Sequence, residues 1–378
     1  MFSQGGPGSR TDVQPAHQYS ARHSLQTIRV RVMGRSDCVV LYNAASIVEI
    51  EGSEERTYPS TVLREEVIAV EESLREAGFS PYVLSVEHFS RELIQTLAKL
   101  APRFVFNLCE AINGKCEFEM CVAGLLDLMK IPYTGSGPMA LGLGLDKFRV
   151  KKLFQASGIP AARGYLLAPG KKLSARRPRF PVIVKPVHED ASLGINSNSV
   201  CHTWAQLEKQ VGYVHSVYLQ EALVEEYLDG REFNVSIIGD GDPEVLAISE
   251  IDFSGMPEGE PRIVSYRAKW DEESPMYRCT TPMCPADIPR RLENRIRDIA
   301  LRSYRCVGCR DYGRVDMRAD ARGALYVLEV NPNPDIAPNA GFARAAGAAG
   351  YTYTKIISKI AQFALERGAK VASTVYAL

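Results

Sequence analysis

Short apolar runs alternate with amphipathic stretches along the first third of the chain. The apolar runs have the length and composition of buried strands, at 38–42, 79–86 and 104–108. The amphipathic stretches repeat their apolar residues at helical spacing, over 61–77, 90–100 and 118–129. Such regular alternation of strands and helices predicts a parallel sheet flanked by helices.

The pattern becomes less regular after residue 137. One continuous helical pattern covers 138–157, and a buried strand over 180–185 ends on Lys185. Later elements are expected at 203–211, 233–238, 244–251, 288–304 and 353–363. Two stretches without periodicity, 186–194 and 258–283, are long or polar enough to be functional loops.

Residues 313–331 have the pattern of a β-hairpin, with two alternating runs around a turn-like segment. A register centred between residues 322 and 323 places Asp316 opposite Glu329 and Arg314 opposite Asn331. Side chains two residues apart on a strand share a face, so all four are expected on one face of the hairpin.

Two carboxylates and an amide oxygen on one face are the hard ligands that suit Mg²⁺, which completes its shell with water and phosphate oxygens. The alternative is a charged, solvated hairpin face with ion pairs. Glu329 lies within the apolar run Leu-Tyr-Val-Leu-Glu-Val, where a buried carboxylate is costly unless a cation or hydrogen bonds compensate it. This position favours the metal site.

The chain has 378 residues, which is enough for two or three domains. Its 45 basic and 45 acidic residues cancel, so no global field favours nucleic acid or an anionic membrane as a partner. No apolar run approaches the roughly 20 residues of a membrane helix, and the polar N-terminus has no signal-peptide pattern. We therefore expect a cytoplasmic protein whose residues 1–35 are disordered.

Nine cysteines without regular spacing fit a reducing compartment better than a disulfide framework. Four of them could be imagined as a zinc site: Cys279, Cys284, Cys306 and Cys309. Their irregular spacing favours buried thiols instead.

The chain has no Walker A loop, and the G-x-G-x-x-A match at 135–140 lacks the acidic residue of a dinucleotide site. Another phosphate site is better supported. Lys185 ends a buried strand, and a buried ammonium needs an anionic partner. The loop that follows contains Ser192 and Gly194, whose backbone N–H groups could contact phosphate oxygens, and Lys147 could add a charge from the preceding helix.

Five motifs occur in the order of a known family: IPYTGSG at 131–137, DK at 146–147, VIVKP at 182–186, GRVD at 313–316 and LEVN at 328–331. Together they resemble the D-alanine–D-alanine ligase branch of the ATP-grasp superfamily over about residues 100–365. The resemblance implies an α/β (α+β) ATP-grasp fold. It places an N-terminal parallel α/β domain at 36–136, a central lid subdomain at 137–222, and a C-terminal subdomain with the metal site at 223–378.

The resemblance also implies which residues bind ATP. Lys147 and Lys185 would contact its phosphates, with Ser192 in the loop that closes over them. The family motif E-x-x-x-x-G-x-E falls on 225–232. The adenine and ribose would be held by Glu225, Tyr227, Leu228 and Glu232.

The remaining implied roles concern the reaction itself. Asp316, Glu329 and Asn331 would bind two Mg²⁺ ions, with Mn²⁺ as an alternative. Arg314 would face an acyl phosphate, and Lys269 in the loop 258–283 would reach the γ-phosphate, so both are predicted to be catalytic. The substrates would be small carboxylates and amines, and the protein a homodimer.

The chain departs from the family where the family binds D-alanine. Trp270 and Ala191 stand at the positions of a tyrosine and a serine, and Asn-x-x-Pro-Gly-Met becomes Asn331-Pro-Asn-Pro-Asp335-Ile336. We therefore expect an ATP-dependent carboxylate–amine ligase acting on an amino acid or amino-acid-like substrate other than D-alanine. One alternative is D-alanine–D-alanine ligation with a divergent site. Another is a nucleotide-binding protein without catalysis, which the intact set of phosphate and metal residues disfavours.

Overall fold

A computed structural model describes residues 36–43, 60–171 and 178–375 of the chain. Its first sheet is parallel, with strand order β2-β1-β3. The strands are β1 (Cys38–Tyr42), β2 (Pro81–Ser85) and β3 (Phe104–Leu108). The helices between and after them are α1 (Ser60–Glu76), α2 (Arg91–Leu100) and α3 (Glu119–Leu128), with a 3₁₀ turn at Cys116–Phe118. The predicted alternation and parallel sheet are confirmed. The predicted disorder of residues 1–35 lies outside the described residues.

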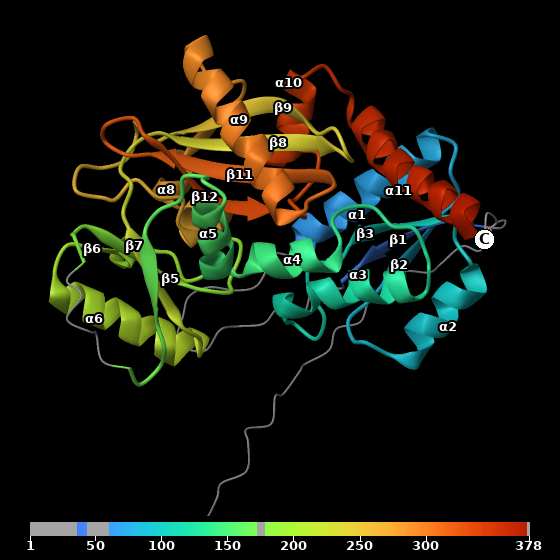
Figure 1. Cartoon of the computed structure of the whole chain (residues 1–378), viewed down its shortest axis with the longest axis horizontal. Helices are drawn as coiled ribbons and strands as arrows, with labels where there is room; N and C mark the ends of the chain where they lie inside the picture. The colour runs from blue at the N-terminus through green and yellow to red at the C-terminus, as the bar shows by residue number, and fades with distance from the viewer. Residues whose placement is uncertain (1–35, 44–59, 172–177, 376–378) are drawn as a thin grey trace, which may run out of the picture. The chain divides into compact units, whose positions relative to one another are not determined.

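The C-terminal helix returns to this first sheet. In α11 (Tyr353–Val375), an apolar stripe that includes Ile356 and Ile360 packs with Leu74 of α1 and Phe106 of β3 in one buried cluster. Figure 1 shows α11 lying beside α1 and β3, although about 280 residues separate it from α1 in the sequence and about 250 from β3. Burial of the apolar stripe of α11 therefore stabilises the first sheet.

The expected single helix over 138–157 is two helices, α4 (Pro138–Leu145) and α5 (Lys147–Ala156). Asp146 separates them because its backbone leaves the helical region and its side chain accepts a hydrogen bond from the Arg149 N–H. A capping aspartate satisfies an N–H that the start of a helix leaves unpaired. The break puts Lys147 at the first position of α5.

The second sheet is antiparallel, with strand order β4-β7-β5-β6. Its strands are β4 (Gly164–Leu167), β5 (Val182–Pro186), β6 (Val200–Cys201) and β7 (Ala222–Glu226). Two further elements accompany it, α6 (Trp204–Tyr213) and a π-helical turn at Val214–Tyr218. Leu207 and Val211 of α6 pack on Val184 and Val224 to form a small separate core.

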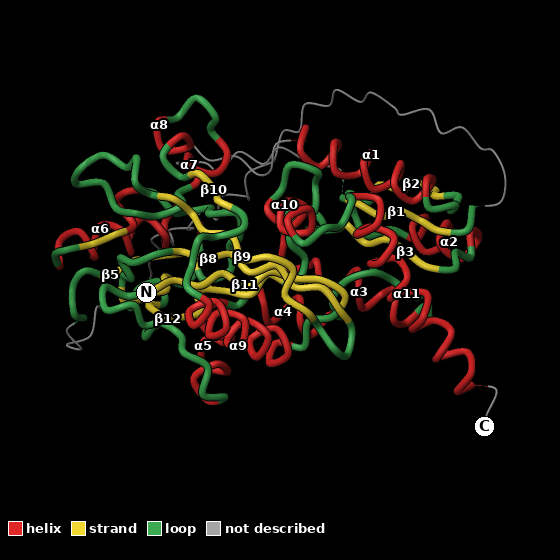
Figure 2. Tube along the Cα trace, turned by 90° about the horizontal axis from the view of Figure 1, so that it is seen from above, coloured by secondary structure: helices red, strands yellow, loops and turns green. Residues whose placement is uncertain are grey.

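The third sheet is antiparallel, with strand order β10-β9-β8-β11-β12. Its strands are β8 (Glu232–Gly239), β9 (Glu244–Asp252), β10 (Thr281–Met283), β11 (Asp311–Ala319) and β12 (Leu325–Asn331). α9 (Arg290–Val307) and α5 cover one face, where Ile296 and Phe154 join the strand side chains in one core. Figure 2 shows these two helices on one side of the sheet and α7 (Tyr266–Trp270) with α8 (Pro275–Arg278) on the other.

The predicted hairpin is β11–β12, and both predicted cross-strand pairs are present. The register nearer the turn differs from the prediction, because Met317 pairs with Val327 and a bulge separates this pair from Asp316–Glu329. A bulge places an extra residue on one strand and shifts the register by one. Because the bulge lies on the turn side of this pair, Asp316 and Glu329 remain opposite each other.

The segment 258–283 is less irregular than expected, since it contains α7, α8 and β10. A last short helix, α10 (Gly341–Ala348), precedes α11. None of the described helices combines the length and apolar composition needed to cross a membrane. The domain boundaries, the cytoplasmic location and the homodimer remain predictions.

Candidate active site

The alternation of side chains gives the third sheet one apolar and one polar face. Val315, Met317 and Phe233 point into the core under α9. The polar face carries directly opposed pairs across neighbouring strands: Glu232 with Arg318, Asn234 with Asp316, Asp316 with Glu329, and Arg314 with Asn331. All four residues of the predicted hairpin face therefore lie together, next to polar residues of β8.

Asp316 is held by N–H donors on both of its carboxylate oxygens. Arg314 donates from Nε to Oδ1 at 2.8 Å and from Nη2 to Oδ2 at 2.7 Å. Asn234 Nδ2 donates to Oδ1 at 2.8 Å. A carboxylate has about four lone-pair sites, so these three contacts leave Asp316 with capacity for about one more ligand. Arg314, predicted to face an acyl phosphate, here orients Asp316.

Positive charge converges on Glu329. Burial raises the pKa of its carboxyl, but nearby cations outweigh burial and the net pKa lies below the ordinary value. The cations are Lys147, Lys185, Arg314 and Lys269. Glu329 is therefore ionised, and four predicted phosphate-binding or catalytic residues surround it.

Lys147 is buried at the start of α5 and touches the loop 186–194. Its Nζ donates to the Glu189 carbonyl oxygen and lies 3.5 Å from Asp190 Oδ1. Burial lowers the pKa of Lys147, but the charges of Asp190 and Glu329 raise it more, so the ammonium stays protonated. The predicted phosphate-contacting lysine and the predicted closing loop are thus in direct contact.

Lys185 shares a carboxylate with a second lysine. Glu225 of β7 is diagonal to Lys185 across the strand pair, and their Oε2 and Nζ atoms are 3.3 Å apart. Lys151 of α5 approaches the other oxygen at 3.0 Å and donates to the Leu328 carbonyl oxygen at 2.7 Å. Burial raises the pKa of Glu225, while the two lysines lower it below the ordinary value. Glu225 thus positions the lysines, and its predicted contact with adenine stays a prediction.

Glu232 is paired with a cation as well. Arg318 Nη1 donates to Glu232 Oε2 at 2.9 Å, and its Nη2 donates to the Arg262 carbonyl oxygen. The Arg318 guanidinium lies near two rings, 5.6 Å from the centroid of Tyr227 and 5.2 Å from that of Phe253. Arg318 therefore adds a charge and two aromatic contacts to the predicted adenine and ribose region, where Leu228 is buried.

The loops 186–194 and 258–283 are joined to each other. Ser192 Oγ donates to the Val264 carbonyl oxygen at 2.9 Å, and Trp270 Nε1 donates to the Ala191 carbonyl oxygen at 2.9 Å. Lys269 Nζ lies 4.9 Å from the centroid of the Trp270 ring. Burial and the charge of Arg314 lower the pKa of Lys269, although neighbouring carboxylates oppose this. The loops thus bring Lys269 to the polar sheet face.

Three residues of this site were not predicted from the sequence: Lys151, Asn234 and Arg318. Two of them continue patterns that the sequence contains. Asn234 follows Glu232 in a strand of alternating polarity, and Arg318 extends the series Arg314, Asp316 by two residues. Lys151 lies four residues after Lys147, which places both on one helix face.

The donor set fits a divalent cation. Asp316, Glu329 and Asn331 offer hard oxygen ligands on one face, and Asn331 Oδ1 accepts one hydrogen bond, from Asn333 N at 2.9 Å. Among the described residues, no three His, Cys, Asp or Glu side chains form a metal cluster on their own. This is compatible with a Mg²⁺ shell that phosphate and water complete, but it does not support zinc. All nine cysteines are free thiols.

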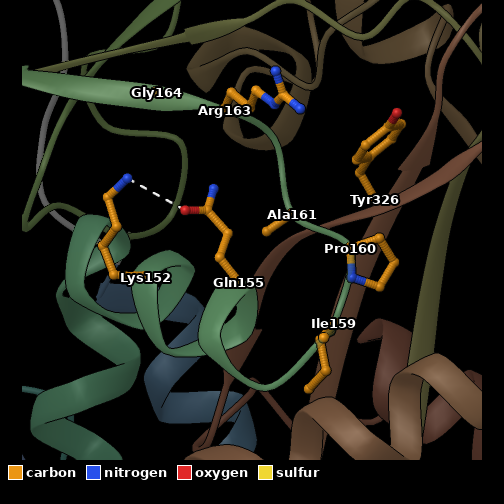
Figure 3. Close-up of a pocket in the computed structure, with 9 residues that line it drawn as sticks. Lys152, Gln155, Ile159, Pro160, Ala161, Arg163, Gly164 and Tyr326 are labelled. Carbon is orange, nitrogen blue, oxygen red and sulfur yellow. Dashed lines mark hydrogen bonds between the residues drawn. The ribbon is translucent and has the colours of Figure 1, made fainter.

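A groove of about 620 Å³ opens where the chain passes from α5 to β4 (Figure 3). Its lining includes Arg163, Tyr326, and the exposed pair Lys152 and Gln155, which are 3.3 Å apart. None of the residues described above lines it. We therefore place the candidate active site at the polar sheet face rather than in this groove.

Comparisons with known proteins agree with this geometry. Residues 153–362, more than half of the chain, match the family model described as the D-ala D-ala ligase C-terminus. The chain is 34% identical to a D-alanine--D-alanine ligase of Cereibacter sphaeroides, over 74% of this chain and 84% of that protein. It is also 34% identical to the uncharacterized protein y4sG of Sinorhizobium fredii, over 82% of this chain and 89% of that protein.

Solved structures share the fold at lower identity. A D-alanine--D-alanine ligase from Bacillus anthracis complexed with ATP matches with a TM-score of 0.67 and 21% identity, over 89% of this chain and 99% of that one. The VanG D-Ala:D-Ser ligase from Enterococcus faecalis matches with a TM-score of 0.65 and 18% identity, over 87% and 99%. With the family model and the curated relatives, these matches show that the chain belongs to the D-alanine–D-alanine ligase family of ATP-grasp carboxylate–amine ligases.

Proposed function

We propose that the protein uses ATP to activate a carboxylate and then joins it to an amine through an acyl phosphate. The observation that carries this proposal is the group of cations around Asp316 and Glu329. Four cations (Lys147, Lys185, Lys269 and Arg314) act on Glu329, although Lys147 also contacts Asp190 and Lys185 also contacts Glu225. Cationic side chains gathered on one face can each contact an oxygen of a polyphosphate anion.

The same face would hold the divalent ions that the family requires. Asp316, Glu329 and Asn331 would be their ligands, and we propose two Mg²⁺ ions. When bound, they would supply further positive charge where the phosphates carry negative charge. The buried lysines supply fixed charge that needs no reorganisation during the reaction.

The proposed reaction has two steps. A carboxylate oxygen attacks the γ-phosphorus of ATP, and the bond to the leaving ADP oxygen breaks. The amine nitrogen then attacks the acyl carbon, the bond from that carbon to the phosphate oxygen breaks, and inorganic phosphate leaves. The nitrogen loses its excess proton to water as the amide forms. Lys147, Lys185 and Lys269 would hold the charge of the phosphates, while the joined loops would exclude water from the acyl phosphate.

We further propose a substrate other than a pair of D-alanines. The resemblance implies that the family has a tyrosine and a serine at the positions of Trp270 and Ala191. Their hydroxyl groups would orient the first D-alanine. Here Trp270 brings one N–H donor, which is used on the Ala191 backbone, and Ala191 brings no polar side-chain atom. Losing the polar partners of a small zwitterion typically costs about 1–3 kcal/mol each.

Incubating the protein with ATP, Mg²⁺ and pools of amino acids, while measuring phosphate release, tests the ligase. Lys185→Ala should silence any turnover, whichever amino acids drive it. Trp270→Tyr combined with Ala191→Ser should shift the preference towards small amino acids. Formation of D-alanine dipeptide at rates equal to the best other pair would overturn the substrate proposal and favour D-alanine–D-alanine ligation. Absence of phosphate release with every pool would sink the ligase proposal.

A further inference from the structure

A group of four carboxylic acids lies beyond Lys269, at the end of the first sheet. Its members are Glu66, Glu110, Glu119 and Asp335, each of which acts electrostatically on at least one of the others. They come from α1, from the segment after β3, from the start of α3 and from the segment after β12. Glu110 lies two residues past the carboxyl end of β3, the edge at which open parallel sheets bind ligands.

Hydrogen bonds from one short segment hold this group together. Asn333 Nδ2 donates to Glu119 Oε1 at 2.9 Å and to the Cys109 carbonyl oxygen, next to Glu110, at 3.3 Å. The backbone N–H of Ile336 donates to Glu66 Oε1 at 3.0 Å. The segment 333–336 therefore contacts all three glutamate-bearing parts of the chain. It begins two residues after Asn331, so the carboxylic acids adjoin the proposed metal face.

Glu110 points to a missing ligand. Its Oε2 is inaccessible to solvent and accepts no hydrogen bond from the described residues, although the residue as a whole is partly exposed. The charges that act on its carboxyl are those of Glu119, Asp335 and Asp190, with Lys269 as the opposing cation. A buried carboxylate oxygen without a partner is costly. A positively charged group that donates a hydrogen bond would remove this cost.

The ligand is expected to be an organic cation rather than a metal ion. The four acids come from separate segments, and one oxygen of Glu119 and one of Glu66 already accept hydrogen bonds from the segment 333–336. Carboxylates that repel one another without converging on a point suit an ammonium or guanidinium group, which offers several N–H donors in different directions. Burial, together with the neighbouring carboxylates, raises the pKa of Glu66 and Glu110, as expected for a site that lacks its counter-ion.

We propose that this group of carboxylic acids binds a second positive charge on the amine substrate, so that the acceptor is a diamine or a basic amino acid. The inference rests on the proposed function, because it places the amine beside the site of acyl transfer. Lys269 links the two groups electrostatically, since its charge acts on both Glu110 and Glu329. One amino group would attack the acyl carbon while the other remains charged against the carboxylates.

Calorimetric titration of the full chain with two matched pairs of probes tests this inference. The pairs are 1,4-diaminobutane against n-butylamine, and L-lysine against L-norleucine. We expect the probe with the extra cation to bind at least tenfold more tightly in one or both pairs. A preference in the first pair indicates a diamine acceptor, and a preference in the second indicates a basic amino acid. Glu110→Gln should reduce that preference at least fivefold, whereas Glu117→Gln, an exposed carboxylate two residues before Glu119, should leave it unchanged.

Asp335→Asn provides a second variant, at a partly exposed position, if Glu110→Gln fails to fold. Equal binding within both pairs, or a preference that survives both substitutions, would overturn the inference. Phosphate release in the presence of ATP and Mg²⁺ separates it from the proposed function. Turnover that norleucine and butylamine support as well as their partners would overturn the cation site and leave the ligase. Tight diamine binding without turnover for any substrate would support the cation site and overturn the ligase.

Discussion

The indole Nε1 of Trp270 lies 2.9 Å from the carbonyl oxygen of Ala191, and this contact joins two loops that are about 80 residues apart in the sequence. Two more hydrogen bonds link the same regions, from Ser192 Oγ to the Val264 carbonyl oxygen at 2.9 Å and from Tyr266 N to the Ile195 carbonyl oxygen at 2.9 Å. Because the loops share these bonds, they are expected to open and close as one unit. Access to the phosphate-binding cations then depends on both.

The first prediction tests this coupling through Trp270→Phe. The substitution keeps an aromatic ring beside Lys269 but removes the indole donor, so the loops 186–194 and 258–283 should both exchange amide hydrogens faster. Hydrogen exchange with and without ATP and Mg²⁺ measures this, and nucleotide should slow exchange in both loops of the unmodified protein. Trp204→Phe, on α6, is the matched control, since Trp204 packs on Phe180. Faster exchange confined to 258–283 would show that the loops move separately.

The second prediction concerns the proposed metal face. Asp316→Asn and Glu329→Gln should each reduce ATP turnover by at least a hundredfold, because each removes one anionic ligand from the phosphate site. The fold should persist, since the amide introduced at position 316 would still offer an oxygen to Arg314 and Asn234. Phosphate release and thermal unfolding measure the two effects. Asp298→Asn, an exposed carboxylate on α9, is the control. Turnover near that of the unmodified protein in either variant would exclude the hairpin as the metal site.

Strong periodicity explains how much of the fold the sequence predicts. The parallel first sheet follows from a regular alternation of strand and helix patterns, and the pairing of Asp316 with Glu329 follows from two strand patterns around one turn. The break at Asp146 was missed because the residues on both sides continue one helical pattern, and only the capping bond of Asp146 interrupts it. The bulge beside Met317 was missed because the run Leu-Tyr-Val-Leu-Glu-Val is apolar almost throughout. The break in its alternation, with Val327 and Val330 in the core and two residues between them, is therefore not evident in the sequence.

The contacts between buried charged residues are harder to predict from the sequence than the residues themselves. Lys185 and Glu225 could each be identified by position, but the contact between them requires the diagonal pairing of β5 with β7. Lys151 reaches the same carboxylate from α5, which follows from the packing of a helix on a sheet and from no local pattern. The carboxylic acids around Glu110 come from four separate segments, so their proximity exists only in the folded chain.

The third prediction treats Lys151, Glu225 and Lys185 as one buried network. Lys151→Met should lower the free energy of unfolding by about 3 kcal/mol, because it leaves a carboxylate with one cation where it had two. Lys151→Met with Glu225→Gln should recover only part of that loss, since both substituted positions are then neutral but Lys185 loses its carboxylate partner. Chemical denaturation of the single and double variants gives the coupling energy. Additive losses would show that the two side chains are independent, contrary to their 3.0 Å contact.

The last prediction concerns the pH dependence of stability near Glu119. Burial raises the pKa of Glu119 to about 8, with a further increase from Asp190 and an opposing effect of the hydrogen bond from Asn333. Glu110 and Cys109 also interact with its charge. In the unfolded chain a glutamate titrates near its ordinary value of about 4.3. Between these two pKa values the folded state holds a proton that the unfolded state has released.

Stability from this group should therefore be present at low pH and decline as pH rises towards 8. Glu119→Gln removes the ionisation, so it should stabilise the ligand-free protein by up to about 5 kcal/mol above pH 8 and by almost nothing near pH 4. Thermal unfolding of both proteins across this range measures the difference, and Glu117→Gln, which is exposed, should show no such trend. A difference that does not change with pH would mean that Glu119 is already ionised in the folded protein. Adding a dicationic probe should reduce the difference above pH 8, because the bound cation compensates the same charge.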